Sequence, residues 1–364
     1  MKRVLGWVAV FLTATTCVSL GQNTMRELAF YEMPNVQGKS DGNGRLPEAV
    51  WETVPVADKF FVYWKVEPIP GEIHSRLRMA YDSQGIYLQV VNQEPAMEKL
   101  RAMIEKRGNP SLWTDDCLQI AFDPNPNGAG HVVFTVNSLG TQDDRKQIDA
   151  SVSLPEWRGE GWKVWTDKGE SAWKVEAFFP FSDFAVQAKA GDLWSFNLVR
   201  FAYTSGAFQG ITWSVGGNYA NRNYFGYLFF GGEDGISADR VAKLLEKQVT
   251  PPWIVAVGNR VVLKDASQPA EILSASEIDR KVSAQAEVVF SKLKPYCRTN
   301  AVLQEKVHTL EGRAKRLKFD SIPLALESVS LMAGIVGEAG QLYWREKLDA
   351  LIEDTSGPSP SSIP

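Results

Sequence analysis

Hydrophobic and polar residues alternate with a period of two along several short segments between residues 41 and 232. The alternation in 76–81 continues in 86–91 after the turn-forming run Asp82-Ser83-Gln84-Gly85, which is typical of a β-hairpin. Many short strands separated by turns predict an antiparallel two-sheet β-sandwich of jelly-roll-like form. The other predicted strands are 117–122, 132–136, 173–179, 193–203 and 225–230.

The pattern changes to helical spacing after residue 232. Ser237 is the expected N-cap of a short helix over 237–248, and Ser276 is the expected N-cap of a helix over 276–294. Short connections containing Pro or Asn predict that these C-terminal helices form a helical hairpin or a three-helix unit. The remaining predictions are helices at 302–319 and 324–352, a strand at 255–262 and a short surface helix at 97–106 within the β region.

The N-terminus resembles an export signal. Lys2 and Arg3 precede a short apolar run, and Ser19 and Gly21 are small residues at the positions expected before a cleavage site. Soluble export to the periplasm or the exterior is favoured over lipid anchoring at Cys17. No segment has about 18 uninterrupted apolar residues, so no transmembrane helix is expected.

These patterns together predict the domain organisation. The expected parts are a signal peptide at 1–21, a lead-in at 22–40, the β-sandwich at 41–232, a connecting segment at 233–275, the helical hairpin or bundle at 276–352 and a disordered tail at 353–364.

Composition excludes some classes of function. The net charge of −4 lacks the basic surplus of a nucleic-acid-binding protein. After signal cleavage two cysteines remain, too few for a disulfide framework, and Cys117 is expected as a buried thiol. No cofactor is expected, and calcium elsewhere in the sandwich is left open as an alternative that no residue pattern supports. Residues 123–128 imitate the start of a calcium loop, but Phe134 stands where its bidentate Glu would be, so a turn is favoured.

Seven short motifs follow one another in the β region. They are, in chain order, Asp41-Gly42 with Trp51, Tyr81-Asp82 with Gly85, Trp113 with Asp116 and Asp123, Phe134 with Asn137, Trp173 with Glu176 and Pro180, Trp194 with Asn197 and Arg200, and Phe225-Gly226 with Leu228. In this order they resemble the family 9 carbohydrate-binding modules and their DOMON-like relatives. The resemblance covers roughly half of the chain. Trp51, Trp173 and Trp194 are assigned to the core, and Glu176 is expected to pair with Arg200.

The resemblance implies a non-catalytic protein that binds polysaccharide or oligosaccharide between two aromatic side chains. Trp113 matches the first stacking position, where a core position is the competing interpretation, and Tyr219 falls near the second. Gln119 stands where the family usually has Glu, Thr135 stands where it has Arg, and Asn137 matches a family Asn. Polar groups must surround such a site because a buried sugar hydroxyl without a partner costs ~1–3 kcal/mol. Asn218 and Arg222, beside Tyr219, are the other candidate contacts.

Three alternative functions remain open beside this hypothesis. A haem or electron-transfer protein would need ligands such as His74 and Met79, whose odd spacing puts them on opposite faces of a strand. A structural protein would assemble through apolar stripes on the C-terminal helices. A glycosidase needs two carboxylates, but Asp115, Asp116 and Glu176 have structural explanations, and no other catalytic signature is present.

Overall fold

A computed structural model gives the fold of two compact units. It describes residues 26–65, 67, 69, 72–125, 128, 130–149, 152–154, 156–232 and 235–355. Leu28–Ser237 form one unit, and Ala238 onward, with the residues before Leu28, form the other. The predicted signal peptide and nearly all of the predicted tail lie outside the described residues.

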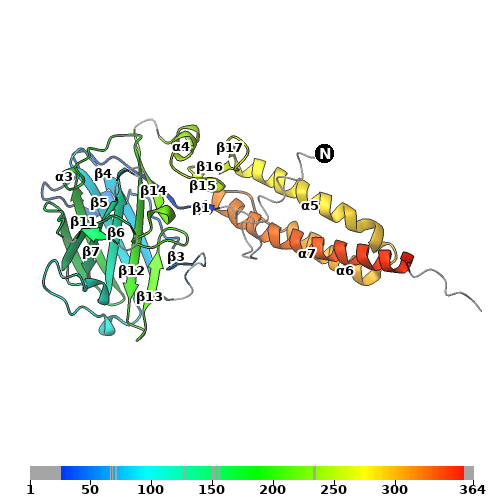
Figure 1. The fold of residues 1–364 in the computed structure, drawn as a ribbon, viewed down its shortest axis with the longest axis horizontal. Coiled ribbons are helices and arrows are strands. Elements are labelled where there is room, and N and C mark those ends of the chain that lie inside the picture. Colours follow the sequence, from blue (N-terminus) through cyan, green and yellow to red (C-terminus); the bar gives the residue numbers. More distant parts are fainter. Residues whose placement is uncertain are drawn as a thin grey trace, which may run out of the picture. The chain divides into compact units, whose positions relative to one another are not determined.

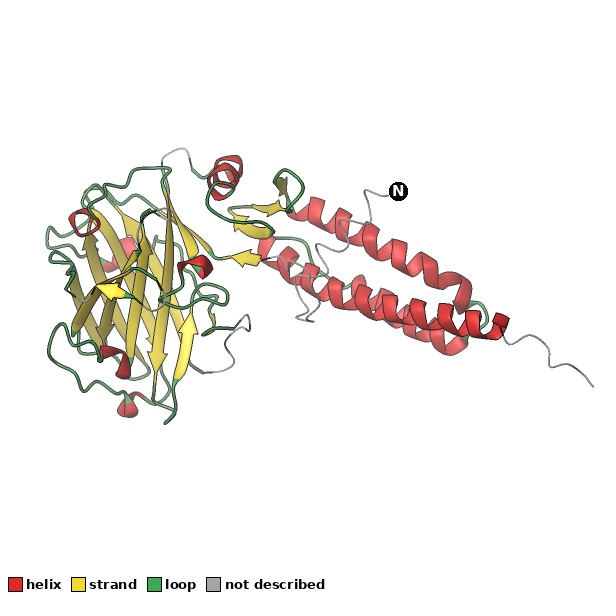
Figure 2. Cartoon of the chain, viewed as in Figure 1, coloured by secondary structure: helices red, strands yellow, loops and turns green. Residues whose placement is uncertain are grey.

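The larger sheet of the first unit has nine strands (Figures 1 and 2). Its main path runs β2-β14-β12-β6-β7-β8-β9, and β13 joins β12 to β3. All of its pairs are antiparallel except β2–β14, which is parallel. The strands are β2 (Phe30–Met33), β3 (Phe61–Val62), β6 (Cys117–Asp123), β7 (His131–Asn137), β8 (Gln142–Gln147), β9 (Ser153–Leu154), β12 (Leu193–Ala202), β13 (Gln209–Thr212) and β14 (Gly226–Phe230).

The second sheet has four antiparallel strands in the order β10-β11-β5-β4. The predicted hairpin is confirmed as β4 (His74–Tyr81) and β5 (Gly85–Gln93), and Asp82 Oδ1 accepts hydrogen bonds from Gln84 N and Gly85 N in the turn. β10 (Lys163–Lys168) and β11 (Ala172–Pro180) complete the sheet.

The core lies between these two sheets and confirms the predicted sandwich. Inward positions of both sheets, such as Leu88 of β5 and Phe122 of β6, belong to one apolar cluster that also holds Trp173 and Trp194. Trp51 is buried in a separate cluster with Tyr87 and other residues. The alternation seen in the sequence therefore does separate inward from outward side chains.

The expected pair between Glu176 and Arg200 is wrong. Arg200 is fully buried, and its guanidinium bonds Glu94 at 2.9 Å, while Glu176 bonds Arg45 at 3.0 Å. Glu176 lies on the outer face of β11, because its neighbours Val175 and Ala177 point into the core. Arg200 instead points between the sheets, where it also donates to the carbonyls of His74 and Gln93. Burial lowers the pKa of Arg200 to about 10, although Glu94 opposes the shift.

The predicted helix at 97–106 is reduced to one turn, η1 (Met97–Lys99). The residues after it run as a loop whose amides donate to two buried carboxylates. Asp116 accepts from Arg101 N at 2.6 Å, and Asp115 accepts from Met103 N and Ile104 N at 3.0 and 2.9 Å. These tertiary bonds replace the helical ones. The other short helices of this unit are α2 (Glu48–Trp51), η2 (Leu112–Thr114), α3 (Phe181–Phe184) and η3 (Arg222–Tyr224).

The second unit begins with α4 (Ala238–Leu245) and a small sheet in the order β1-β15-β16-β17. The single strand expected at 255–262 is a hairpin, because Gly258 adopts a positive φ of 56° at the turn between β15 and β16. The strands are β1 (Arg26–Leu28), β15 (Trp253–Val257), β16 (Arg260–Lys264) and β17 (Glu271–Leu273).

Three helices complete the second unit: α5 (Ala275–Cys297), α6 (Ala301–Ala314) and α7 (Ile322–Thr355). They share one apolar core that includes Ile278, Leu310 and Ile335. The N-cap of α5 is Ser274, two residues before the expected Ser276, because Ser274 and Glu277 form a reciprocal capping box. Of the described helices, α7 alone is long and apolar enough over Ile322–Asp349 to span a membrane, a criterion that core helices also meet.

Candidate functional site

A row of aromatic side chains lies near the edge of the nine-stranded sheet formed by β3 and β13. The ring of Trp64 lies 5.4 Å from that of Tyr63, which lies 6.1 Å from that of Phe208, and Phe208 lies 5.6 Å from Tyr203, all between centroids. Tyr203 Oη donates a hydrogen bond to the Trp113 carbonyl at 3.0 Å. We call these five residues the aromatic strip.

The strip is open to solvent. Trp64, Trp113 and Phe208 are 60%, 48% and 47% exposed, and Tyr63 and Tyr203 are half-buried. The buried ring of Phe201 lies below it, 5.7 Å from Tyr63 and 5.1 Å from Phe208. Tyr63 and Phe208 therefore stand on a packed apolar base, and Trp64 joins it through its contact with the ring of Tyr63.

The backbone at Trp64 is strained, and the surrounding structure holds it in this conformation. Its φ is 67°, in the left-handed region that a bulky side chain seldom adopts and that costs about 1–3 kcal/mol. The backbone here is fixed by bonds to the 214–219 loop, since Gly216 N donates to Lys65 O at 3.0 Å and Trp64 N donates to Gly217 O at 3.4 Å. On the other side, Tyr63 N donates to Gly210 O of β13 at 2.9 Å. Such strain persists only where surrounding structure enforces it, and it is frequent at binding sites.

The two carboxylates that follow Trp113 hold the other end of the strip. Asp116 accepts from the backbone amides of Arg101 and Tyr203, and Asp115 anchors the same loop. Burial raises the pKa of the Asp116 carboxyl, although those two amides favour its charged form. The guanidinium of Arg101 lies 5.6 Å from the centre of the Tyr203 ring.

Tyr219 lies on the outer side of the same sheet but is less open than expected. Its half-buried ring lies 6.4 Å from Phe201, and the Arg145 guanidinium lies 5.2 Å from its centre. His131 Nε2 lies 2.7 Å from the Tyr219 carbonyl oxygen. Burial lowers the pKa of His131 to about 4, so a neutral imidazole donates this bond. Tyr219 therefore belongs to the ring cluster around Phe201, and Trp113 is joined to this cluster through its backbone carbonyl, which accepts from Tyr203 Oη.

Gln119 and Asn137 are buried beneath this surface. Asn137 Nδ2 donates to Ile104 O and Asp115 Oδ2, and its Oδ1 accepts from Leu139 N and Thr141 N. Gln119 lies opposite Thr135 in the β6–β7 register, and Gln119 Oε1 and Thr135 Oγ1 are buried without a hydrogen-bond partner.

Asn218 and Arg222 hold the loop that carries Tyr219. Asn218 is fully buried, and its Oδ1 accepts from Ala220 N and Asn221 N, both at 2.7 Å. Arg222 Nη1 donates to Asp123 Oδ2 at 3.2 Å and to Gly128 O at 2.9 Å. Asn137, Asn218 and Arg222 thus have partners within the protein, whereas Gln119 Oε1 has none among the described residues.

The residues missed by sequence reasoning are four members of the strip: Trp64, Tyr63, Phe208 and Tyr203. The adjacent Tyr63-Trp64 pair before a polar, Pro-containing segment was an available signal. So were Tyr203 and Phe208 on either side of Ser205-Gly206. Their gathering on one surface depends on the β12–β13 and β3–β13 pairings, which the sequence pattern did not reveal.

The described residues give little support to haem binding or metal binding. Met79 lies in the sandwich core, and His74 is on the opposite face of β4. Among the described residues no group of three or more His, Cys, Asp or Glu side chains is placed to hold a metal ion.

No protein-family model matches the chain. No curated protein matches it. Among solved structures, it is similar to a candidate carbohydrate-binding protein from Bacteroides uniformis, with 17% identity, a TM-score of 0.46, and 56% of this chain and 99% of the other covered. It is also similar to a family 9 carbohydrate-binding module from Caldicellulosiruptor kristjanssonii, solved with glucose (14% identity, TM-score 0.40, 57% and 99% covered) and with cellotriose (13%, 0.41, 59% and 96%).

Proposed function

We propose that this chain is an exported, non-catalytic carbohydrate-binding protein, and that saccharide rings stack on the aromatic strip. The observation that carries the proposal is the group of open rings of Trp64, Phe208 and Trp113. Phe208 packs on the buried ring of Phe201, Trp64 packs beside Tyr63, and the backbone carbonyl of Trp113 accepts a hydrogen bond from Tyr203. The C–H face of a sugar is apolar and suits a flat, fixed aromatic ring.

Polar side chains beside the strip supply partners for sugar hydroxyls. Lys65, Arg101, Ser205 and Gln209 are exposed and neighbour strip residues in the chain or in space. An apolar platform with polar groups at its margin is what a saccharide needs, since its hydroxyls must exchange water for new partners. In this proposal Tyr219 supports the base of the strip more than it stacks on the ligand.

The carboxylates beside Trp113 support binding over hydrolysis. Asp115 and Asp116 are buried, and each accepts two or more hydrogen bonds from protein groups. A glycosidase needs two carboxyl groups facing its substrate, and these two face the backbone.

Binding would be tested with the full chain and a panel of polysaccharides and oligosaccharides that includes glucose and cellotriose, by calorimetry and by depletion on insoluble glycans. We expect Trp64→Ala and Trp113→Ala each to weaken binding by about tenfold, or about 1.4 kcal/mol, through loss of a stacking partner.

The matched control is Trp344→Ala on α7, whose indole is similarly exposed but lies in the other unit. It should leave saccharide affinity unchanged. The proposal fails if no glycan binds, or if the Trp64→Ala/Trp113→Ala double variant binds as the wild type does. Export would be tested separately by N-terminal sequencing of the secreted protein, with Gln22 expected as the first residue.

A further inference from the structure

The three open rings of the aromatic strip are separated from one another by its two half-buried tyrosines. Trp64 and Phe208 each contact Tyr63, and Tyr203 joins Phe208 to the backbone of Trp113. Within the part of the chain that the structure describes, Trp64, Phe208 and Trp113 make no ring contact with one another. A single sugar ring is about the size of one aromatic ring, so a ligand that uses all three positions must be a chain.

Three separate segments of the first unit build this surface. Trp64 follows β3, Trp113 lies in η2, and Phe208 precedes β13. Asp116 accepts a hydrogen bond from the Tyr203 amide at 2.9 Å, which ties the segment before Phe208 to the residues after η2. The open rings are therefore held in place before a ligand arrives, and a surface ordered in advance lowers the cost of binding an extended ligand.

The ring expected to face Trp113 across a bound sugar is covered within the protein. The Arg145 guanidinium lies 5.2 Å from the centre of the Tyr219 ring, and this ring also packs against Phe201. Arg145 is itself held by an ion pair with Asp143 at 3.3 Å. Enclosing the sugar at a chain end between two walls requires an open face on each wall, and this cation occupies one face of Tyr219.

We infer that the aromatic strip binds an internal segment of a polysaccharide, laid along its three open rings, and that it needs no chain end. This inference rests on the saccharide binding proposed above and names the form of saccharide that the strip takes. A chain long enough to reach a second ring gains a second stacking contact within the same complex. Several protein molecules can then occupy one polysaccharide chain.

Calorimetry on the full chain with cello-, xylo-, manno- and laminari-oligosaccharides of two to six residues tests the inference. For the series that binds, we expect affinity to rise by about tenfold or more from two residues to six, because longer chains reach further rings. Reduction of the terminal sugar with borohydride should change the affinity of the hexasaccharide by less than about twofold, because the strip does not enclose that end.

The number of protein molecules bound per chain separates the two modes of binding directly. A soluble polysaccharide of known mean length is titrated once in its native form and once after reduction of its ends. We expect several protein molecules per chain, and the same number for both forms. A site for chain ends would take at most one protein molecule per end, however long the chain is.

Variants of the two exposed tryptophans test the contribution of separate rings. The tenfold losses expected above for Trp64→Ala and Trp113→Ala belong to chains long enough to span the strip. For a disaccharide each single variant should lower affinity by less than about threefold, because a short ligand still finds another open ring. Circular dichroism would verify that both variants are folded.

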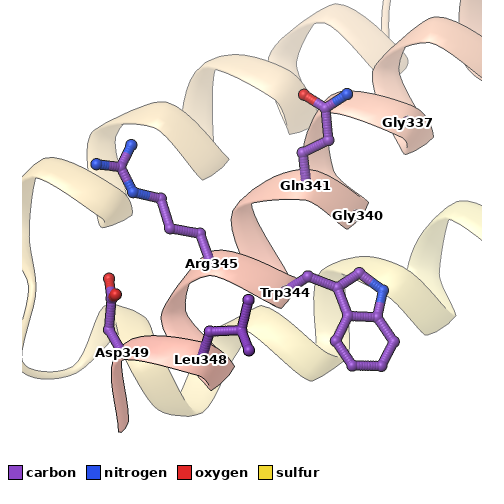
Figure 3. Close-up of a pocket in the computed structure, with 7 residues that line it drawn as sticks. All are labelled: Gly337, Gly340, Gln341, Trp344, Arg345, Leu348 and Asp349. Carbon is purple, nitrogen blue, oxygen red and sulfur yellow. The ribbon is translucent and has the colours of Figure 1, made fainter. Parts of the chain in front are cut away.

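The control for an exposed ring outside the strip is again Trp344→Ala. Figure 3 shows the indole of Trp344 extending from α7 beside a shallow groove of about 590 Å³, where it is the one aromatic side chain among the seven residues drawn. The variant should leave the rise of affinity with chain length unchanged.

Affinity that stays level between two and six residues, or that is lost when the end is reduced, overturns recognition of internal segments and leaves saccharide binding intact. One protein molecule per chain end has the same consequence. If no glycan binds at all, the proposed saccharide binding itself fails, so the two failures are distinguishable.

Discussion

His131 is the buried group whose protonation matters most for the loop around Tyr219. Its pKa is about 4 in the folded chain against 6.5 for a free histidine, because burial disfavours the imidazolium. Between these values the unfolded chain binds the proton and the folded chain does not. The contribution of neutral His131 to the free energy of unfolding is therefore fully present above pH 6.5. It is lost as the pH falls toward 4, and the total loss is about 3 kcal/mol.

The His131→Gln variant isolates this effect, since the glutamine amide stays neutral. We expect the unfolding free energy of the wild type, relative to the variant, to fall between pH 7 and pH 4. NMR of the His131 ring should show no titration near pH 6.5. A titration there, or a difference between the two proteins that does not vary with pH, would refute the assignment.

The sequence predicts the burial of some residues better than that of others. The burial of Trp51, Trp173 and Trp194 was predictable because strands and a core helix bury large apolar side chains. The openness of Trp64 and the half-burial of Tyr219 were not, since both lie in loops whose position is set by pairing between distant strands. Asn218 in a polar loop indicated exposure, yet backbone amides of its own loop hold it inside.

The sequence predicted those helices and strands that depend on interactions between residues close together in the chain. The β4–β5 hairpin depends on its own turn, and the helices of the second unit depend on apolar spacing. The helix expected at 97–106 failed because Asp115 and Asp116, more than ten residues away in the chain, capture its amides. The strands β8 and β10 were missed because β8 is entirely polar and the two apolar residues of β10, Val164 and Trp165, are adjacent, so no apolar alternation marks either strand.

Two serines at the start of α5, Ser274 and Ser276, allow a matched test of the N-cap. Ser274 Oγ accepts from Glu277 N, and the Glu277 side chain accepts from Ser274 N at 2.8 Å. We expect Ser274→Ala to lower the unfolding free energy of the helical unit by about 1 kcal/mol. The exposed Ser276, two residues later, should tolerate alanine within about 0.5 kcal/mol. Urea unfolding followed by circular dichroism measures both, and equal costs would contradict the observed cap.

At the scale of the whole molecule, each unit has an apolar core of its own. Compact units with separate cores can unfold separately, so we expect two transitions in calorimetry. Ser274→Ala should shift only the transition of the helical unit, and His131→Gln should alter the pH dependence of the other alone. One transition moved by both variants would show that the chain unfolds as a single cooperative unit.

The free cysteines give these two units natural chemical reporters. Among the described residues Cys117 is sealed within the sandwich and Cys297 is half-buried at the end of α5, so each unit carries one thiol. Burial raises the pKa of the Cys117 thiol, which suppresses the reactive thiolate. A maleimide pulse should therefore modify Cys297 in the native protein, whereas Cys117 should react only during transient opening of the sandwich. The rate at Cys117 then reads out how often that opening occurs, with no substitution in the chain.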